Sequence, residues 1–351
     1  MSYLLVSVLL IGFGNVSQGF VKSLVDRRDR LREAFGIELS ICSVVEVVRG
    51  EYHSAFSSTG LDLESLLRVK RQEGVVSAYS NGGGHDSTPD LIKKSRAQLL
   101  IEATPTNLRN GEPALTYIKT ALESGMDVVT SNKGPLVFAL NQLRNLAKLN
   151  KVEFKYSAAV AGALPIIPTG DYTLTGAQVS SIEGILNGTT NYILTQMERE
   201  GVEMKEGLAD AQQKGIAETD PRLDISGDDT AFKLLIAANS IMQSDTKITD
   251  VSISGIENVT HDDIMAAKKR GHALKLIGTA RKTNSGVDMK VQVEEVGPEH
   301  PFFGVNGTSK AVLFNTDILG RIILSGGESN PQLAAGAMLR DILNIYRNSK
   351  T

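Results

Sequence analysis

The sequence predicts an α/β protein with two domains, and three observations support this fold class. The chain has 351 residues, which is enough for two separate hydrophobic cores. Its composition, with 41% hydrophobic and 22% charged residues, is typical of a globular protein. An apolar run at residues 4–11, a glycine-containing turn and an amphipathic segment follow one another at the start of the chain. This order of elements is typical of folds in which strands and helices alternate.

The first part of the chain continues this alternation. Residues 4–11 and 37–48 are rich in leucine and β-branched residues, which predicts strands buried on both faces. Apolar residues recur at helical spacing between them, in residues 18–35. A strand–helix–strand unit of this kind implies parallel strands joined by a right-handed crossover. Further elements are expected as strands at 99–103 and 127–130 and a helix at 113–124.

From about residue 152 the pattern becomes typical of an α+β domain with its own sheet. We expect a first domain at residues 1–135, a second at 136–325, and a C-terminal helix at 326–347 that returns to the first domain. The expected elements of the second part are strands at 152–156, 179–186, 288–294 and 311–315, and helices at 191–200, 206–213, 230–242 and 261–270.

The bulk properties argue against several classes of function. A net charge of −3 gives no reason to expect a nucleic-acid partner. No segment approaches the roughly 18 apolar residues of a membrane-spanning helix, and the N-terminus lacks signal-peptide features, so we expect a soluble, cytoplasmic protein. The single cysteine, Cys42, lies in an apolar run and is expected to be a small buried residue. The five histidines have no metal-ligand spacing, which argues against zinc chemistry.

A glycine motif follows the first strand, with the sequence Gly12-Phe13-Gly14-Asn15-Val16-Ser17. Gly12 permits a tight turn, and Gly14 lets the main chain approach a pyrophosphate at the N-terminus of the next helix. Ser17 stands where a third glycine or an alanine is usual. The strand–turn–helix context favours a Rossmann-type dinucleotide-binding domain, with a purely structural turn as the alternative.

The end of the second strand carries Glu46, Val47 and Arg49. In dinucleotide-binding domains an acid at this point binds the ribose 2′-hydroxyl, whereas an arginine accommodates a 2′-phosphate. If Val47 occupies the reading position, Arg49 is available for a phosphate, which slightly favours NADP over NAD. Two solvated charges at a strand end remain an equally good interpretation.

Ser131 and Lys133 follow a buried strand at the carboxyl edge of the predicted sheet. Ligands of open α/β sheets bind outside the carboxyl ends of the strands. A lysine there can anchor a carboxylate or lie near a carbonyl group that is reduced. We favour this role for Lys133 over that of an ordinary surface lysine.

The densest group of charged residues lies in residues 215–233, where Glu218, Asp220, Asp224 and Asp229 precede Lys233. Asp229 and Lys233 are four residues apart with the acid first, the favourable order on a helix. Lys233 is surrounded by apolar residues, so its ammonium must pair with an acid, reach solvent or lose its proton. A buried ammonium held by carboxylates can donate a proton to a carbonyl oxygen during hydride transfer. A capped helix with one internal ion pair is the structural alternative.

Residues 184–193 join a strand to a helix through a polar turn that contains Asn187, Thr189, Thr190 and Asn191. Capping of the helix needs only one of these side chains. The surplus of hydroxyl and amide groups favours binding of a small polar ligand.

Together these motifs resemble the homoserine dehydrogenases, and the resemblance covers essentially the whole chain. The matching segments are residues 12–17, 131–133, 160–167, 184–193, 215–233 and 271–277. The resemblance implies an oxidoreductase that interconverts L-aspartate 4-semialdehyde and L-homoserine with NAD(P). This reaction belongs to the aspartate pathway, which leads to threonine, methionine and isoleucine. The form expected is the short one, without an ACT or aspartate kinase domain, and a homodimer that associates through the sheet of the second, substrate-binding domain.

The resemblance also implies roles for individual residues. Lys233 and Lys133 become the catalytic lysines, which places the reaction in a cleft between the domains. The expected substrate-binding residues are Glu218, Asp224, Asp229, Gly188, Thr189 and Gly215. The expected cofactor-binding residues are Gly12, Phe13, Gly14, Asn15, Val16, Arg49, Thr104, Ser131, Lys133 and Gly326.

Two departures from the family pattern concern a cation and the nicotinamide. The main-chain carbonyls of Val160, Gly162 and Leu164 are the expected ligands of a monovalent cation such as Na⁺. Ser157 stands where the family often has a glutamate that helps to hold this cation. Glu328 is an added carboxylate in the segment that normally approaches the nicotinamide.

Two alternatives to this function were weighed. One is another Rossmann-fold dehydrogenase that acts on a small amino-acid aldehyde. The other is a cofactor-binding regulatory protein without catalysis. The second is disfavoured because such a protein has little physical reason to keep so many buried charges.

Overall fold

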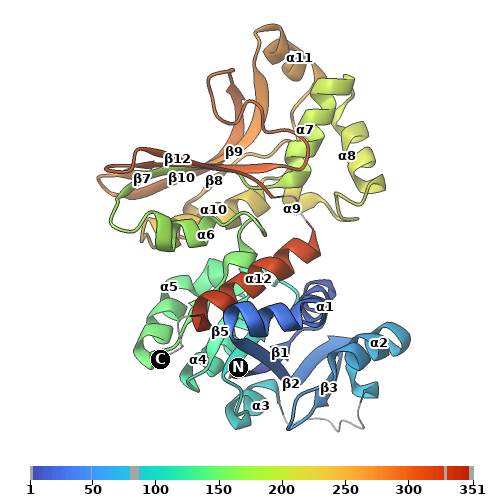
Figure 1. The fold of residues 1–351 in the computed structure, drawn as a ribbon. Coiled ribbons are helices and arrows are strands. Elements are labelled where there is room, and N and C mark those ends of the chain that lie inside the picture. Colours follow the sequence, from blue (N-terminus) through green and yellow to red (C-terminus); the bar gives the residue numbers. More distant parts are fainter. Residues whose placement is uncertain (1–2, 49, 80–86, 328–329, 348–351) are drawn as a thin grey trace. The chain divides into compact units, whose positions relative to one another are not determined.

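The computed structural model describes residues 3–48, 50–79, 87–327 and 330–347, and it divides into two compact units (Figure 1). Unit 1 comprises Met1–Ala159 and Asn330–Thr351, and unit 2 comprises Val160–Ser329. The division follows Ala159, whereas the sequence analysis placed it at residue 135. The reason is that strand β6 (Phe154–Lys155) pairs in parallel with β5 (Asp127–Thr130) and so belongs to the sheet of unit 1.

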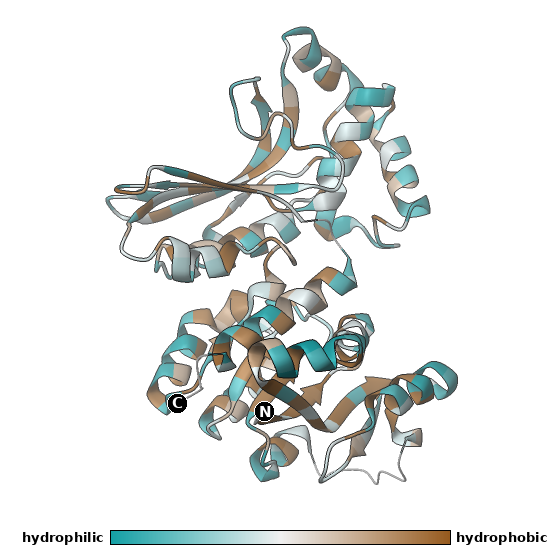
Figure 2. Ribbon diagram, viewed as in Figure 1, coloured by the Kyte–Doolittle hydropathy of each residue, from teal (hydrophilic) through white to brown (hydrophobic). Residues whose placement is uncertain are grey.

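Unit 1 contains a six-stranded sheet of the order β3-β2-β1-β4-β5-β6. All neighbouring strands are parallel except β3, which pairs antiparallel with β2 and was not predicted. The central strand β1 is fully buried at Val6, Val8 and Leu10, which explains its continuous apolar sequence (Figure 2). The remaining strands of this sheet are β1 (Leu4–Ile11), β2 (Ile37–Val48), β3 (Glu51–Phe56) and β4 (Leu99–Glu102).

Helices cover the sheet of unit 1. They are α1 (Asn15–Arg30), which continues as a π-helical turn (Leu31–Phe35), α2 (Leu63–Glu73), α3 (Thr88–Lys94), α4 (Ala114–Glu123), α5 (Lys133–Asn150) and α12 (Pro331–Tyr346). Short 3-10 turns lie at Val76–Ala78 and Ser157–Ala159.

Helix α12 returns to unit 1 and packs against α1 (Figure 1). It begins at Pro331, five positions after the predicted start at residue 326. The Asn330 side chain accepts a hydrogen bond of 2.9 Å from the main-chain N–H of Leu333 and caps the helix. Gly326 ends a strand of unit 2 instead of opening this helix.

Unit 2 contains a second six-stranded sheet of the order β12-β11-β7-β9-β10-β8. Its neighbouring strands are antiparallel except for β10 and β8. The strands are β7 (Val179–Ile185), β8 (Ser252–Ile253), β9 (Ala273–Thr283), β10 (Gly286–Val296), β11 (Lys310–Thr316) and β12 (Arg321–Gly326). The strand predicted at 152–156 belongs to the other unit, whereas β8, β9 and β12 were not predicted.

The helices of unit 2 include the two that carry the predicted site residues, α7 (Gly188–Glu200) and α10 (Asp228–Ile241). Both contact β9 of this sheet. The other helices are α6 (Ile166–Pro168), which continues as a π-helical turn (Thr169–Thr173), α8 (Met204–Gln213), α9 (Arg222–Ile225) and α11 (His261–Lys269), and a 3-10 turn lies at Ile248–Asp250.

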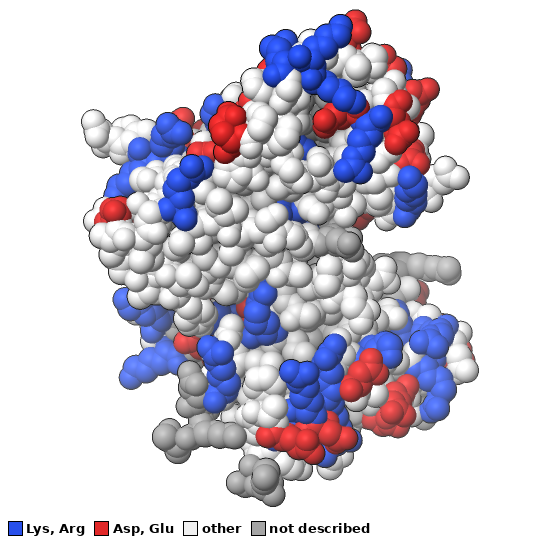
Figure 3. All heavy atoms as spheres, turned by 45° about the horizontal axis from the view of Figure 1, so that its top comes forward, with Lys and Arg blue, Asp and Glu red and all other residues white. Residues whose placement is uncertain are grey.

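The described part of the chain holds no helix with the length and apolar character needed to cross a bilayer. On the face shown in Figure 3, Lys and Arg side chains lie interspersed with Asp and Glu side chains.

Candidate active site

The glycine turn of unit 1 depends on the absence of a side chain at Gly12. Gly12 has a φ of +89°, and a Cβ atom there would lie 2.4 Å from the main-chain oxygen of Ala103. The Gly12 N–H donates a 2.7 Å hydrogen bond to the carbonyl of Val45. The turn therefore holds β1, β2 and β4 close together near their carboxyl ends. Any residue larger than glycine at position 12 would push β1 and β4 apart.

The N-terminus of α1 presents main-chain N–H groups without competing acids. Gly14 is the capping residue, no side chain caps the helix, and the first turn has no acidic residue. A Cβ at Gly14 would meet no atom within 4 Å, so the space beside it is open. Such an end, formed here by Gly14, Asn15 and Val16, suits the binding of an anionic phosphate group. Phe13 and Ser17 are buried behind it.

Glu46, at the end of β2, has its carboxylate turned inward. It is 4% exposed, and its two oxygens accept hydrogen bonds from Lys70 Nζ at 2.6 Å and from the Val76 N–H at 2.8 Å. Val47 is 55% exposed. Arg49, which the sequence analysis linked to a 2′-phosphate, lies outside the described residues, as does Glu328. Glu46, the acid expected near the ribose, is thus already hydrogen-bonded to Lys70 and Val76.

Glu102 organises the carboxyl edge of the same sheet, although the sequence analysis did not single it out. It is fully buried at the end of β4. One carboxylate oxygen accepts hydrogen bonds from Thr104, and the other accepts one of 2.7 Å from Thr130 Oγ1. Burial raises the pKa of Glu102, while the hydrogen bonds from Thr104 and Thr130 oppose this rise.

The Glu102 network fixes the turn that carries Ser131 and Lys133. Asn132 donates from Nδ2 to the carbonyl of Thr104 at 3.2 Å and caps α5 by accepting a 3.0 Å bond from the Gly134 N–H. The Ser131 N–H donates to the main-chain oxygen of Glu102 at 3.2 Å. Lys133 is the first residue of α5 and is partly buried. The turn therefore places Thr104, Ser131 and Lys133 at one edge of the sheet.

In unit 2, four polar side chains from three segments form one hydrogen-bonded cluster. Asn187 Nδ2 donates to Asp224 Oδ1 at 2.6 Å and to Asp229 Oδ2 at 2.8 Å. Lys233 Nζ donates to Asp229 Oδ2 at 2.5 Å and to the carbonyl of Leu186 at 3.1 Å. We call Asn187, Asp224, Asp229 and Lys233 the acid–lysine cluster. The side chains of Asp229 and Lys233 are 8% and 14% exposed, so this ion pair is largely shielded from water.

Asn187 orients this cluster through its cap on α7. Its Oδ1 accepts a 2.9 Å bond from the Thr190 N–H, which leaves the amide hydrogens directed at the two carboxylates. The helix cap and the acid network thus share one side chain. Gly188 and Thr189 follow directly in the first turn of α7, and Thr189 Oγ1 donates to the carbonyl of Ile216 at 3.2 Å.

Glu218 lies apart from the acid–lysine cluster. Its side chain is exposed, and its main-chain carbonyl accepts a 3.2 Å bond from Gln212 Nε2. Gly215, with a φ of +68°, ends the turn after α8 and is also exposed. The structure therefore brings Asp224, Asp229 and Lys233 together, but Glu218 is not in their hydrogen-bond network within the described residues.

Lys310, at the start of β11, is a second lysine near this ion pair. It is 2% exposed, and its Nζ donates to the carbonyl of Ala161 at 3.3 Å. Burial and the nearby ammonium of Lys233 lower the pKa of Lys310 to about 7, against the opposing effect of Asp229. The sequence signal was a single lysine in front of an apolar strand, and it was overlooked.

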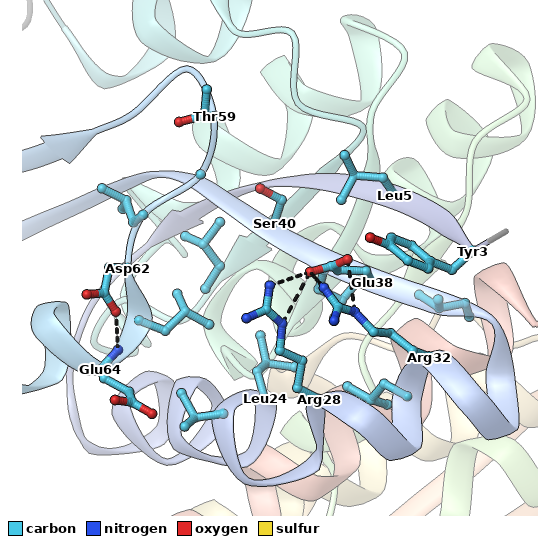
Figure 4. Close-up of a pocket in the computed structure, with 18 residues that line it drawn as sticks. Tyr3, Leu5, Leu24, Arg28, Arg32, Glu38, Ser40, Thr59, Asp62 and Glu64 are labelled. Atoms are coloured by element: carbon cyan, nitrogen blue, oxygen red, sulfur yellow. Dashed lines mark hydrogen bonds and ion pairs between the residues drawn. The ribbon is translucent and has the colours of Figure 1, made fainter. Parts of the chain in front are cut away.

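A hollow of about 650 Å³ in unit 1 is not part of this site (Figure 4). It lies beside the amino-terminal residues of β1 and β2, at the strand ends opposite the glycine turn. Its guanidinium groups are already paired, because Arg28 and Arg32 both contact the carboxylate of Glu38 (Figure 4). The hollow is lined by none of the site residues predicted from the sequence.

Comparison with known proteins supports one family. The sequence profile described as homoserine dehydrogenase matches residues 165–343. The chain is 38% identical to the homoserine dehydrogenase of Methanocaldococcus jannaschii, covering 98% of this chain and 99% of that protein. It is 33% identical to the NAD(+)-dependent homoserine dehydrogenase of Pseudomonas canavaninivorans, covering 97% and 96%. The solved structure of a homoserine dehydrogenase from Thermoplasma acidophilum is similar with a TM-score of 0.80, 26% identity and coverage of 99% and 100%.

Proposed function

The chain belongs to the homoserine dehydrogenase family, and we propose that it interconverts L-homoserine and L-aspartate 4-semialdehyde by means of the acid–lysine cluster. Membership of the family makes it an NAD(P)-dependent oxidoreductase that acts on a CH–OH group. The similarity to homoserine dehydrogenases favours this function over the two alternatives, another Rossmann-fold dehydrogenase of a small amino-acid aldehyde and a cofactor-binding protein without catalysis. The observation that carries the proposal is the shielded Asp229–Lys233 pair, held by Asn187.

Lys233 is the proposed proton donor and acceptor. In the reductive direction a reduced nicotinamide, when bound, would supply the hydride for the aldehyde carbon. The ammonium of Lys233 donates a proton to the aldehyde oxygen, which becomes the hydroxyl of homoserine. Asp229 holds the ammonium in place through its 2.5 Å contact, and the carbonyl of Leu186 directs a second N–H bond. The third hydrogen of the ammonium remains for the substrate.

The substrate is proposed to bind around this lysine. Asp229 lies where it can accept a hydrogen bond from the hydroxyl group, and Asp224 is linked to it through Asn187. Gly188 and Thr189 present the N-terminus of α7, and Glu218 and Gly215 belong to the loop that precedes α9. Glu218 is proposed to bind the amino group of the substrate. Lys133 is proposed as the second catalytic lysine, and its turn is held by the Glu102 network.

The cofactor is proposed to bind along the carboxyl edge of the unit 1 sheet. Gly12, Phe13, Gly14, Asn15 and Val16 would receive the pyrophosphate, because they form the open N-terminus of α1. Thr104, Ser131 and Lys133 follow the next strands along the same edge, and Gly326 completes the proposed set.

We propose NADP as the preferred cofactor. Glu46 is buried against Lys70 and Val76, so its carboxylate is not available to a ribose 2′-hydroxyl. Arg49 is the proposed partner of the 2′-phosphate. Replacing Arg49 with alanine should lower kcat/KM for NADP by about tenfold and leave that for NAD nearly unchanged, as expected for the loss of one charge-assisted hydrogen bond. An equal loss with both cofactors would contradict this assignment.

We propose that no monovalent cation binds the turn that was expected to hold one. Val160, Gly162 and Leu164 were the expected ligands through their carbonyl oxygens. The carbonyl of Leu164 accepts a 2.8 Å bond from the Ile166 N–H, and the carbonyl of Ala161, between the other two, accepts the Lys310 ammonium. A second positive charge next to this ammonium would be repelled. We therefore assign no step of the reaction to a cation.

The protein is further proposed to form a homodimer through the sheet of unit 2. Three apolar side chains at β12 and the preceding turn are exposed, Ile318 at 70%, Leu319 at 44% and Ile323 at 47%. Exposed apolar groups that cluster in this way are typical of protein interfaces. Light scattering on a sizing column would test the dimer, and Ile323→Asp should shift it toward monomer. A cytoplasmic location is also proposed and would be tested by cell fractionation.

The function is tested by following the absorbance of the reduced nicotinamide with L-homoserine, using NAD and NADP separately. We expect reduction of both, faster with NADP. No reduction of either cofactor, in a folded protein that binds the cofactor, would refute the proposed substrate.

A further inference from the structure

The turn at Val160–Leu164 and the lysine that contacts it share an unusual local structure. Ala161 has a φ of +59° and Gly162 a φ of +62°, so two successive residues are left-handed. A left-handed alanine costs roughly 1 kcal/mol and persists only when surrounding contacts hold it. The 3.3 Å bond from Lys310 Nζ to the Ala161 carbonyl is such a contact, and both partners are buried.

Lys310 also connects this turn to the acid–lysine cluster. It directly precedes Ala311, which pairs with Ile185 at the end of β7. The next residue after Ile185 is Leu186, whose carbonyl accepts the Lys233 ammonium, and Asn187 follows. The charges of Lys233 and Asp229 both act on Lys310, so the three groups lie near one another. One buried side chain therefore touches the turn and lies close to the proposed proton donor.

We propose that Lys310 is a positioning residue whose ammonium supplies, from within the chain, the positive charge that a bound monovalent cation would otherwise bring to this turn. The role rests on the proposed function, because its benefit is the orientation of Asp229 and Lys233 for proton transfer. It follows that the enzyme works without Na⁺ or K⁺.

The first experiment uses the unmodified enzyme. kcat, KM for homoserine and the melting temperature are measured in choline chloride, NaCl and KCl at equal ionic strength, with saturating cofactor and at a pH below 7, where Lys310 keeps its proton. All three quantities should be the same in the three salts. An increase of kcat or melting temperature in NaCl or KCl would overturn the proposal, because it would reveal a cation site that Lys310 does not fill.

The second experiment uses Lys310→Met and Lys310→Arg. Lys310→Met should lose about tenfold to a hundredfold in kcat in choline chloride, with a smaller change in KM, as expected for misplacement of the proton donor. NaCl or KCl should restore part of kcat and raise the melting temperature of this variant. Lys310→Arg should keep most of the activity and remain indifferent to the salt.

Lys275→Met is the matched control. Lys275 is also a fully buried lysine of unit 2, but its Nζ contacts Val305, Asn306 and Asn191 rather than the turn. This variant should lose stability without any response to Na⁺ or K⁺. A native kcat in Lys310→Met, or an equal salt response in the control, would overturn the proposal. The melting temperatures report on Lys310 even if homoserine is not the substrate, so the two proposals can fail independently.

Discussion

The two units of this chain differ in the charged groups that they bury and in whether main chain or side chains form the proposed site. Among the described residues, unit 1 buries the carboxylates of Glu46, Glu102 and Asp341, whereas unit 2 buries the ammonium groups of Lys275 and Lys310 together with the carboxylate of Asp229. In unit 1 the proposed cofactor surface is main chain, formed by the glycine turn and the N-terminus of α1. In unit 2 the proposed reaction centre is made of charged side chains that hold one another.

This difference predicts how each unit fails. A surface of main-chain N–H groups is disturbed by a change of backbone conformation, and the loss should appear in cofactor affinity and stability. A centre made of an ion pair is disturbed by removal of one charge, and the loss should appear in kcat. The predictions below test this contrast, beginning with the largest expected effect.

Lys233→Ala should lower kcat by about a hundredfold to ten-thousandfold, the usual contribution of a positioned general acid. Cofactor affinity, measured by quenching or enhancement of nicotinamide fluorescence, should stay near the native value. Lys290→Ala is a suitable control, because Lys290 forms a partly exposed pair of the same i, i+4 spacing with Glu294. Near-native kcat in Lys233→Ala, or an equal loss in the control, would contradict the role of Lys233.

Gly12→Ala should destabilise unit 1 by about 3 kcal/mol, because the added Cβ would meet the Ala103 carbonyl oxygen at 2.4 Å. Cofactor binding should weaken together with stability, since the turn and the anion-binding surface are the same main chain. Urea unfolding and a cofactor titration would measure the two effects.

Substitutions at two other glycines distinguish the effect of a positive φ from the effect of the contact between the added Cβ and Ala103. Gly74 also has a positive φ, of +77°, but a Cβ there meets nothing, so Gly74→Ala should cost only about 1 kcal/mol. Gly14→Ala should leave stability nearly unchanged and still weaken cofactor binding, because the space beside Gly14 is open. If Gly12→Ala lowers the unfolding free energy no more than Gly74→Ala does, the close approach to Ala103 is not the reason why residue 12 has to be glycine.

Glu102→Gln should cost about 1–3 kcal/mol of unfolding free energy. Both carboxylate oxygens accept hydrogen bonds, so the amide NH₂ of glutamine would face a donor on one side. The turn that carries Lys133 should loosen, and kcat should fall by about tenfold. Glu153→Gln serves as the control, since Glu153 is an exposed carboxylate whose partner is Lys155. Equal stability of the two variants in urea would argue against an organising role for Glu102.

The features that could be predicted from the sequence are those that a local pattern of residues determines. The bounds of β1, β2 and β5 were predicted correctly, because an apolar run between turn residues determines a buried strand by itself. The residues of the acid–lysine cluster also lie in the sequence segments 184–193 and 215–233, whose many polar and charged side chains are visible in the sequence. β3 was missed because it is a mostly exposed edge strand without a clear alternation.

Glu102 and Lys310 were missed for a different reason. Each is a single charged residue at the end of an apolar strand, a position that is usually solvated. Their burial depends on partners far away in the sequence, Thr130 at 28 residues from Glu102 and Ala161 at 149 residues from Lys310. A local pattern cannot report such contacts, because they exist only once the sheets have formed.

The stability of unit 2 should also depend on pH, through a lysine outside the proposed site. Burial lowers the pKa of Lys275 from 10.5 to about 8. Below pH 8 both the folded and the unfolded chain carry the proton, so the cost of the buried charge is fully present. Between pH 8 and 10.5 the folded chain releases this proton while the unfolded chain keeps it, and stability therefore rises with pH.

Lys275→Met should remove this rise, because methionine does not titrate. The difference in unfolding free energy between the native chain and Lys275→Met, measured in urea, should shift in favour of the native chain from pH 8 to pH 10.5. Lys282→Met, which changes an exposed lysine of β9, should show no such shift. A constant difference for Lys275→Met would mean that its ammonium is solvated in the folded state, and unit 2 would then bury less positive charge than the contrast with unit 1 requires.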